Sequence, residues 1–199
     1  MAETTRMTPG CTALLVMDYQ QGIVDSLAVG DDLLGRVARA ISVARQRGAT
    51  VGYVRVAFDQ ADFDALPPRS AMAAITSRGT DAFRSDSPAT AIHPSVAPQP
   101  GDIVVRKTRV GAFSTTDLHR QLQQRGISCL VLAGIATSGV VLSTLRGAAD
   151  RDYRVAVLAD ACADRDPEVH RCLVDKVFPR QAAIVAVDQL HSLLGKGEA

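Results

Sequence analysis

Short apolar runs alternate with helical patterns along most of the chain. Thr12–Met17 is a continuous apolar run with the length of a strand buried on both faces. Leu33–Arg47 instead places its apolar residues at helical spacing, and Gly48 is suited to end that helix. Further apolar runs predict strands at Thr50–Val56, Asp102–Val105, Cys129–Ala133, Arg154–Leu158 and Ala183–Val187.

Helical patterns follow most of these strands. Ser114 and Asp188 are placed to cap two helices, and Pro167 fits the first turn of another. The predicted helices are Ser114–Gln124, Ser138–Asp150, Pro167–Val177 and Asp188–Leu194. This alternation predicts one α/β domain over residues 1–199, with helices on both faces of a six-stranded, mainly parallel sheet.

The segment Phe58–Pro100 departs from the alternation. Seven prolines and glycines break it up. We expect an irregular excursion with at least one short helix near Ala71, because proline and glycine interrupt regular elements.

Composition narrows the class of protein. The chain has 199 residues, 47% of them apolar and 22% charged, with a net charge of +1. These values are typical of a soluble globular protein and give no electrostatic reason to expect nucleic acid or a membrane surface as a partner. No apolar run approaches the roughly 18 residues of a membrane span, and Met1–Gly10 lacks the apolar core of a signal peptide. The four cysteines show no metal-binding spacing, so we expect reduced thiols in a cytoplasmic protein.

Chemically capable residues follow several of the predicted strands. In open α/β sheets, ligands bind beyond the carboxyl ends of the strands, which directs attention to Asp18, Lys107 and Gly134–Val140. Each of these three candidates also has an interpretation without a catalytic role. Asp18 could cap a short helix, Lys107 could be a solvated lysine in a basic loop beside Arg106, and the third segment could be an ordinary turn of small residues.

Three motifs in this chain resemble the isochorismatase-like superfamily, also called the cysteine hydrolases. Asp18-Tyr19-Gln20 matches its D-x-Q signature. Lys107–Leu118, KTRVGAFSTTDL, matches K-x-x-x-[SG]-A-F-x-x-T-x-L. Gly134–Leu142, GIATSGVVL, is similar to the strand-to-helix turn G-[VI]-[AT]-T-x-x-C-V. The resemblance covers most of Thr12–Asp164 and implies a Rossmann-like α/β/α sandwich with strand order 3-2-1-4-5-6.

The resemblance also implies catalytic positions. Asp18 matches the aspartate that exchanges protons with the nucleophile and the substrate, and Lys107 matches the catalytic lysine. A lysine beside Asp18 would hold the carboxylate ionised or stabilise negative charge on the substrate. The nucleophilic cysteine of the family falls on Val140. The resemblance therefore implies a hydrolase scaffold whose attacking group is missing.

Substrate-binding positions follow from the same motifs. Gln20, Phe113, Ile135, Ala136 and Thr137 match residues near the substrate in the family. Amide N–H groups at the start of the helix would face the pocket, and the Ile135–Ala136 peptide would be cis. Such a helix start can bind an anion or polarise a carbonyl without a cysteine.

Metal ligands and a substitute thiol are the remaining candidates. Nicotinamidases of the superfamily carry metal-binding aspartate and histidine after the second strand, whereas Arg55–Phe63 holds carboxylates without a histidine. We therefore expect no metal and no other cofactor, with Asp59 and Asp62 as surface or helix-cap residues. Cys162 follows the fifth predicted strand and could replace the missing nucleophile, but we favour a packing role because a buried thiol behaves as a small hydrophobe.

The function then depends on which hydrolysis reactions can proceed without a nucleophilic thiol. Valine has no lone pair for covalent amide hydrolysis. Isochorismatases share the fold without needing a cysteine, because hydrolysis of a vinyl ether needs only a proton on its terminal carbon. Lys107 would lower the pKa of such an acid, so burial of Asp18 would have to offset it. We predict a hydrolase of a small anionic or carbonyl substrate that forms a homodimer or higher oligomer. The alternatives are a catalytically silent ligand-binding protein and an amide hydrolase with a displaced cysteine.

Overall fold

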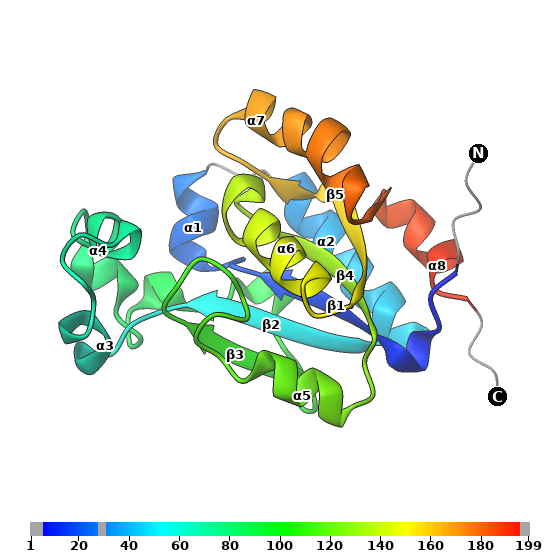
Figure 1. Cartoon of the computed structure of the whole chain (residues 1–199), viewed down its shortest axis with the longest axis horizontal. Helices are drawn as coiled ribbons and strands as arrows, with labels where there is room; N and C mark the ends of the chain where they lie inside the picture. Colours follow the sequence, from blue (N-terminus) through cyan, green and yellow to red (C-terminus); the bar gives the residue numbers. More distant parts are fainter. Residues whose placement is uncertain (1–5, 28–30, 196–199) are drawn as a thin grey trace.

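A six-stranded parallel sheet forms the centre of the computed structural model, which describes residues 6–27 and 31–195 (Figure 1). The strands run in the order β3-β2-β1-β4-β5-β6, and all neighbours are parallel. Their bounds are β1 Thr12–Met17, β2 Thr50–Val56, β3 Ile103–Lys107, β4 Cys129–Ile135, β5 Arg154–Ala163 and β6 Ala183–Val185. The predicted fold class and strand order are confirmed.

Helices cover both faces of this sheet. The α-helices are α1 Gln21–Ser26, α2 Asp31–Gln46, α3 Gln60–Asp64, α4 Ala71–Thr76, α5 Leu118–Gln124, α6 Leu142–Ala149, α7 Pro167–Cys172 and α8 Leu190–Leu193. The shorter 3-10 and π-helical turns are η1 Pro9–Cys11, η2 Thr80–Phe83, η3 Pro88–Thr90, η4 Pro94–Val96, η5 Thr137–Val141, η6 Leu173–Val177, η7 Phe178–Arg180 and η8 Val187–Gln189. None of the helices in the described ranges is long and apolar enough to cross a membrane.

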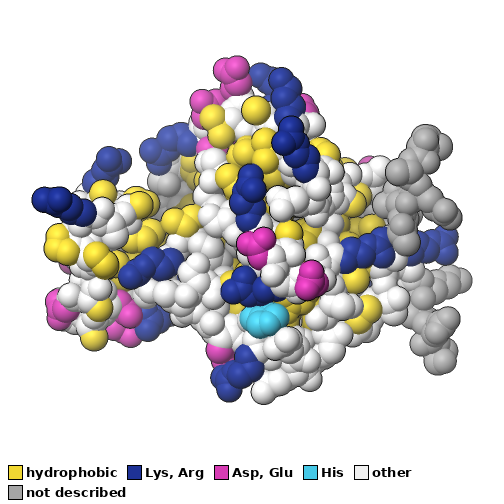
Figure 2. All heavy atoms as spheres, in the orientation of Figure 1, with side chains coloured by type: hydrophobic (Ala, Val, Ile, Leu, Met, Phe, Trp, Pro, Cys, Tyr) yellow, Lys and Arg dark blue, Asp and Glu magenta, His cyan; other side chains and the backbone are white. Residues whose placement is uncertain are grey.

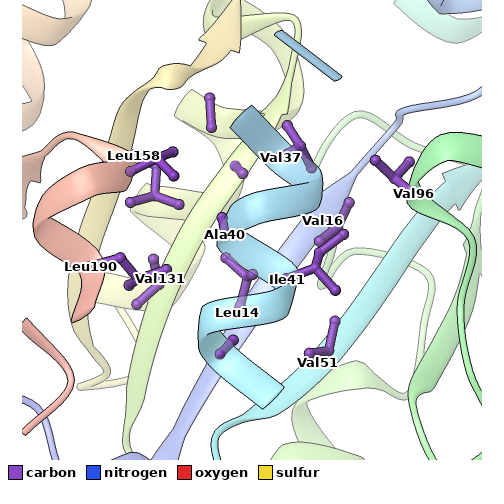
Figure 3. Close-up of a cluster of buried hydrophobic side chains, with 14 of the residues drawn as sticks. Leu14, Val16, Val37, Ala40, Ile41, Val51, Val96, Val131, Leu158 and Leu190 are labelled. Carbon is purple, nitrogen blue, oxygen red and sulfur yellow. The ribbon is translucent and has the colours of Figure 1, made fainter. Parts of the chain in front are cut away.

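Alternate residues of the central strand supply the two halves of the core. Leu14 and Val16 of β1 pack in one apolar cluster, under Val37 and Ile41 of α2 (Figure 3). Ala13, Leu15 and Met17 point to the opposite face and join a second cluster with residues of α5 and α6. The continuous apolar run of this strand follows from burial on both faces.

Most helix boundaries agree with the sequence pattern. Gly48 lies two residues after the end of α2. Its φ is 77°, a value that glycine adopts at no steric cost. Pro167 begins α7 directly after Asp166, whose side chain accepts the Glu168 and Val169 N–H groups. The predicted helix from Ser138 begins as the π-helical turn η5 and continues as α6.

Two predicted helix caps are wrong. The helix expected from Ser114 begins at Leu118, with Asp117 at its N-cap. The preceding residues are held in a turn by bonds from Thr108 N–H to Thr115 Oγ1 and from Thr116 Oγ1 to the Ala112 carbonyl, which compete with helix formation. Asp188 lies inside η8, whose N-cap is Ala186.

The excursion 58–100 begins at the carboxyl end of β2, carries α3 and α4, and returns to the amino end of β3 (Figure 1). The short helix expected near Ala71 is confirmed as α4. Asp59 is the N-cap of α3 and forms a capping box with Asp62, and both carboxylates bind Arg106. The surface and helix-cap interpretation of these two residues is confirmed.

Candidate active site

Asp18 and Lys107 meet at the carboxyl edge of the sheet. Asp18 directly follows β1, Lys107 is the last residue of β3, and β2 lies between them. The Lys107 Nζ lies 2.8 Å from Asp18 Oδ2, and only 3% and 7% of the two side chains are exposed. The predicted convergence is confirmed, and the alternative of a solvated Lys107 is wrong.

The backbone places Asp18 at a sharp change of direction. Its φ is 60°, in the left-handed region that few residues other than glycine adopt, although aspartate is among the more tolerant. Its N–H donates to the Val54 carbonyl at 2.8 Å, which ties the turn to β2. Asp18 caps no helix, because the N-cap of α1 is Gln20. Backbone outliers of this kind gather at functional sites.

Burial dominates the electrostatics of Asp18. It raises the pKa of the carboxyl above its ordinary value of 3.8, and the attraction and hydrogen bond of Lys107 only partly oppose this. Oδ1 of Asp18 is buried and has no hydrogen-bond partner in the described part of the chain. The two oxygens are therefore unequal: Oδ2 is paired with the Lys107 ammonium group, whereas Oδ1 is buried without a partner among the described residues.

Gln20 fixes the excursion 58–100 to the edge of the sheet. Its Nε2 donates to the carbonyls of Val56 and Thr90 at 2.8 and 2.9 Å, and its Oε1 accepts the Val56 N–H at 2.7 Å. Both amide N–H groups are thus used by the protein itself. The substrate contact expected for Gln20 stays a prediction.

The turn after β4 has the backbone that the resemblance implies. The Ile135–Ala136 peptide is cis, and Thr137–Val141 form the π-helical turn η5. Thr137 is fully buried. The roles of Ile135, Ala136 and Thr137 in substrate binding stay predictions.

Two residues that the sequence did not single out brace this turn. The Thr137 hydroxyl lies 2.8 Å from His170 Nδ1, and the Ser138 N–H donates to Asp164 Oδ2 at 2.7 Å. Burial lowers the pKa of His170, while the charges of Asp164 and Asp175 oppose this. Asp164 directly follows β5, just as Asp18 directly follows β1. An aspartate directly after a strand was therefore the sequence signal that could have identified Asp164.

Val140 is an apolar part of the same turn. It is 2% exposed and packs in the cluster that contains Met17, the residue before Asp18. A Cβ added to Gly134, near the end of β4, would lie 3.0 Å from Val141 Cγ2 of the turn and 3.2 Å from Met17 Cβ, so the glycine lets the turn pack close to the end of β1. The correspondence between Val140 and a nucleophilic cysteine stays an inference from the sequence motif.

The Phe113 ring packs away from the Asp18–Lys107 pair, and its expected substrate contact stays a prediction. Its ring stacks on Tyr153 with centroids 6.0 Å apart. Tyr153 precedes Arg154, which is level with Thr12 through the register of β5, β4 and β1. Asp18 comes six residues after Thr12, roughly 20 Å away at the rise of a strand. Phe113 is close to Lys107 along the chain. The loop after β3 nevertheless carries its ring toward the amino ends of the strands, away from the carboxyl ends where Asp18 and Lys107 lie.

The surroundings of the cysteines and carboxylates bear on the substitute nucleophile and on a metal site. Burial raises the pKa of Cys162 to about 12, which agrees with a packing role. Cys129 is also buried, and Cys172 is exposed on α7. The described residues contain no group of three or more His, Cys, Asp or Glu side chains that could hold a metal ion.

A cavity of about 530 Å³ lies beside α1, the end of β2 and α4, and its lining includes neither Asp18, Lys107 nor Val140. Gln20, two residues after Asp18, and Val56, the register partner of Lys107, are among its lining residues. Arg165 also lines it and directly follows Asp164, which binds the turn. The cavity is therefore lined by sequence and register neighbours of the Asp18–Lys107 pair and not by the pair itself.

Comparisons with known proteins agree with this geometry. The family model for the isochorismatase domain matches residues 12–189. A ureidoacrylate amidohydrolase, RutB, from Methylobacterium radiotolerans is 33% identical over 97% of this chain and 83% of its own length. An Arabidopsis thaliana protein named "Probable inactive nicotinamidase" is 32% identical over 80% of this chain and 84% of its own. The solved structure of an isochorismatase family protein from Burkholderia thailandensis superposes with a TM-score of 0.79 at 28% identity, covering 95% and 97% of the two chains.

Proposed function

This chain belongs to the isochorismatase family, and we propose that it hydrolyses a small molecule without a cysteine nucleophile, using Asp18 as general acid. The observation that carries the proposal is the state of the Asp18 carboxyl. It is buried, its pKa is raised despite the adjacent Lys107, and its Oδ1 has no partner among the described residues. A general acid needs a pKa raised toward the working pH.

Lys107 completes the proposed acid. When Asp18 gives up its proton, the resulting carboxylate lies 2.8 Å from the Lys107 ammonium group, in surroundings that exclude water. A charge pair is strongest where water is excluded. Lys107 thus stabilises the state that follows proton transfer, while burial keeps the proton in place beforehand.

A vinyl ether illustrates the chemistry that this pair can perform. Asp18 protonates the terminal carbon of the double bond, which leaves an oxocarbenium ion. Water adds to that ion, and the adduct breaks down to an alcohol and a carbonyl compound. A proton released from the water returns to Asp18. One molecule of water is consumed and no covalent bond to the protein is formed, so no thiol is needed.

Two features support a mechanism without a thiol. Val140 occupies the motif position of the family nucleophile and has no lone pair. Cys162, the thiol nearest in the sheet register to the turn, is buried with a pKa of about 12 and so is almost wholly protonated near neutral pH. We therefore favour general-acid catalysis by Asp18 over nucleophilic attack by a displaced cysteine.

A catalytically silent ligand-binding protein is the second candidate. It is favoured by the same valine and by the name of the Arabidopsis relative, an inactive nicotinamidase. Such a protein would keep the cavity and the buried pair but turn over nothing.

The test is a panel of substrates assayed with wild type, Asp18→Asn and Asp25→Asn, the last being an exposed aspartate on α1 as matched control. The panel contains isochorismate as a vinyl ether, with ureidoacrylate and nicotinamide as amides. We expect Asp18→Asn to lower turnover by about 10²- to 10⁴-fold and iodoacetamide to leave wild-type turnover intact. Turnover blocked by iodoacetamide with Cys162 labelled would overturn the proposal. Absence of any turnover would favour the silent protein.

A further inference from the structure

We propose that Tyr19 is a positioning residue of the candidate active site, whose hydroxyl fixes the direction of the Asp18 carboxyl by binding the Ala161 carbonyl of β5. This deepens the proposed function by adding a residue to the same site. It rests on that function only for the claim that loss of the hydroxyl lowers turnover.

The side chains of Asp18 and Tyr19 reach toward opposite edges of the sheet. Asp18 pairs with Lys107 at the end of β3, whereas the Tyr19 hydroxyl donates to the Ala161 carbonyl of β5. These two residues follow β1, which lies between those strands in the order β3-β2-β1-β4-β5-β6. Two successive residues therefore hold one turn from both sides.

The turn needs this support because of its backbone. Asp18 has a φ of 60°, and a residue other than glycine stays in this region only where its surroundings enforce it. The Asp18 N–H donates to the Val54 carbonyl at 2.8 Å, and the Tyr19 carbonyl accepts the His93 N–H at 2.9 Å. The Tyr19 hydroxyl adds an attachment to β5. Without that attachment the backbone can relax and turn the carboxyl away from Lys107.

The segment of β5 that accepts this bond is itself held in place. The Asp160 carbonyl accepts the Arg36 Nε–H at 2.5 Å, and Asp160 Oδ1 accepts the Val187 N–H at 2.9 Å. Cys162 pairs with Gly134 near the end of β4, which leads into the turn η5. A tyrosine bonded to this segment therefore fixes the proposed acid relative to the turn.

Tyr19 suits this role because its ring is packed and its hydroxyl keeps its proton. The side chain is 2% exposed and belongs to the apolar cluster that contains Val37 and Ile41 of α2. Burial raises the pKa of the hydroxyl well above its ordinary value of 10.0, so the group stays a hydrogen-bond donor. Replacing tyrosine by phenylalanine removes this donor and keeps the ring.

Tyr19→Phe tests the proposal, and the other two tyrosines of the chain supply matched controls. Tyr53 and Tyr153 are also buried, and their hydroxyls bond the Ala97 carbonyl and His119 Nδ1. Tyr53→Phe and Tyr153→Phe therefore lose the same group at other places. A purely structural role of Tyr19 would make the three variants alike, each less stable than wild type and with an unchanged site.

Two measurements report on the Asp18–Lys107 pair without any substrate. Carbon-13 NMR follows the Asp18 carboxyl, whose pKa should fall toward the ordinary 3.8 in Tyr19→Phe, because a loosened turn admits water. Acetylation by a succinimidyl ester, read by mass spectrometry, follows the Lys107 side chain, which is 3% exposed. It should react about tenfold faster in Tyr19→Phe, because losing one hydrogen bond favours local opening. The exposed Lys176 is the internal reference.

The outcomes separate this inference from the proposed function. If Tyr19→Phe matches the two controls in the titration of Asp18 and in the acetylation of Lys107, the inference is wrong even for an active hydrolase. A change confined to Tyr19→Phe upholds it even if no substrate of the panel is turned over. If one is turned over, kcat should fall by a larger factor than KM rises.

Arg36→Gln provides a second variant in case Tyr19→Phe does not fold. Arg36 is half-buried on α2, and its loss frees the Asp160 carbonyl next to the accepting Ala161. Both measurements should then move in the same direction as expected for Tyr19→Phe, by a smaller amount. Values equal to those of wild type would overturn the inference.

Discussion

At the scale of single residues, Asp18 is a carboxylic acid in buried surroundings that disfavour its charged form. The unfolded chain exposes it to water, whereas the folded chain buries it and raises its pKa. Because the folded carboxyl holds its proton more tightly, its contribution to stability is present at low pH and is lost as pH rises through the folded pKa. The loss can reach about 1.4 kcal/mol per pH unit in that window.

Asp18→Asn should therefore change the pH dependence of the free energy of unfolding. Asparagine has no proton to lose, so the variant should gain stability relative to wild type as pH rises from about 4, the ordinary pKa of an aspartate. Urea unfolding at a series of pH values measures this difference. The exposed Asp25→Asn variant is the control. If the wild type instead gained stability relative to Asp18→Asn over the same pH range, the result would contradict this prediction.

The cysteines should differ in reactivity according to their burial. Cys172 is exposed, whereas Cys162 is buried and its pKa is raised to about 12. Iodoacetamide at pH 8 should therefore label Cys172 in the folded protein and Cys162 only after unfolding, as mass spectrometry of peptides can show. Rapid labelling of folded Cys162 would restore the displaced-cysteine mechanism.

At the scale of elements, Gln20 joins the start of α1, the end of β2 and the excursion 58–100. Gln20→Leu keeps the approximate size but leaves the carbonyls of Val56 and Thr90 and the Val56 N–H without this partner. Each buried group left unsatisfied costs about 1–3 kcal/mol. We expect the variant to lose at least about 2 kcal/mol of stability and to exchange amide hydrogens faster around Thr90.

Gln21→Leu is the matched control for this prediction. Gln21 is the next residue along the chain, is half-buried, and among the described residues its side chain bonds only the exposed Asp25. Its replacement should change the stability by less than about 0.5 kcal/mol, as is usual for surface positions. Equal losses in the two variants would show that Gln20 does not anchor the excursion.

The elements also show where sequence reasoning succeeds and where it fails. Apolar runs located all the strands, because burial on both faces of a parallel sheet leaves a continuous pattern. The pairing of Asp18 with Lys107 was predictable, since both follow strands at one edge. The packing of Phe113 and the contact of His170 with Thr137 depend on how loops fold back in space, and nothing in local spacing encodes this. Ser114 failed as a cap because neighbouring threonines form competing bonds.

At the scale of the whole molecule, the face shown in Figure 2 carries no large field of one charge among the described residues. Basic and acidic side chains are scattered over the face shown in Figure 2, with apolar patches between them, and the net charge of the chain is +1. A small-molecule substrate as the partner of this protein stays a prediction. The sheet ends in the edge strand β3, where Val104 is 48% exposed.

We expect the chain to associate at least as a dimer. The excursion 58–100 projects from the body of the molecule (Figure 1) and is the segment we expect to cross between subunits. Sedimentation should then give a mass of at least about twice the 21.1 kDa of one chain. A single species near 21.1 kDa at high protein concentration would contradict this expectation.

The most direct test of the account is a titration of the Asp18 carboxyl itself. The side-chain carbon of Asp18 can be assigned by comparing carbon-13 NMR spectra of wild type and Asp18→Asn. The account predicts that this resonance titrates with a pKa above the ordinary 3.8, and that Lys107→Met raises the pKa further by removing the opposing charge. A carboxyl of wild type that titrates at or below 3.8 would show that Lys107 outweighs burial. Asp18 would then be no general acid.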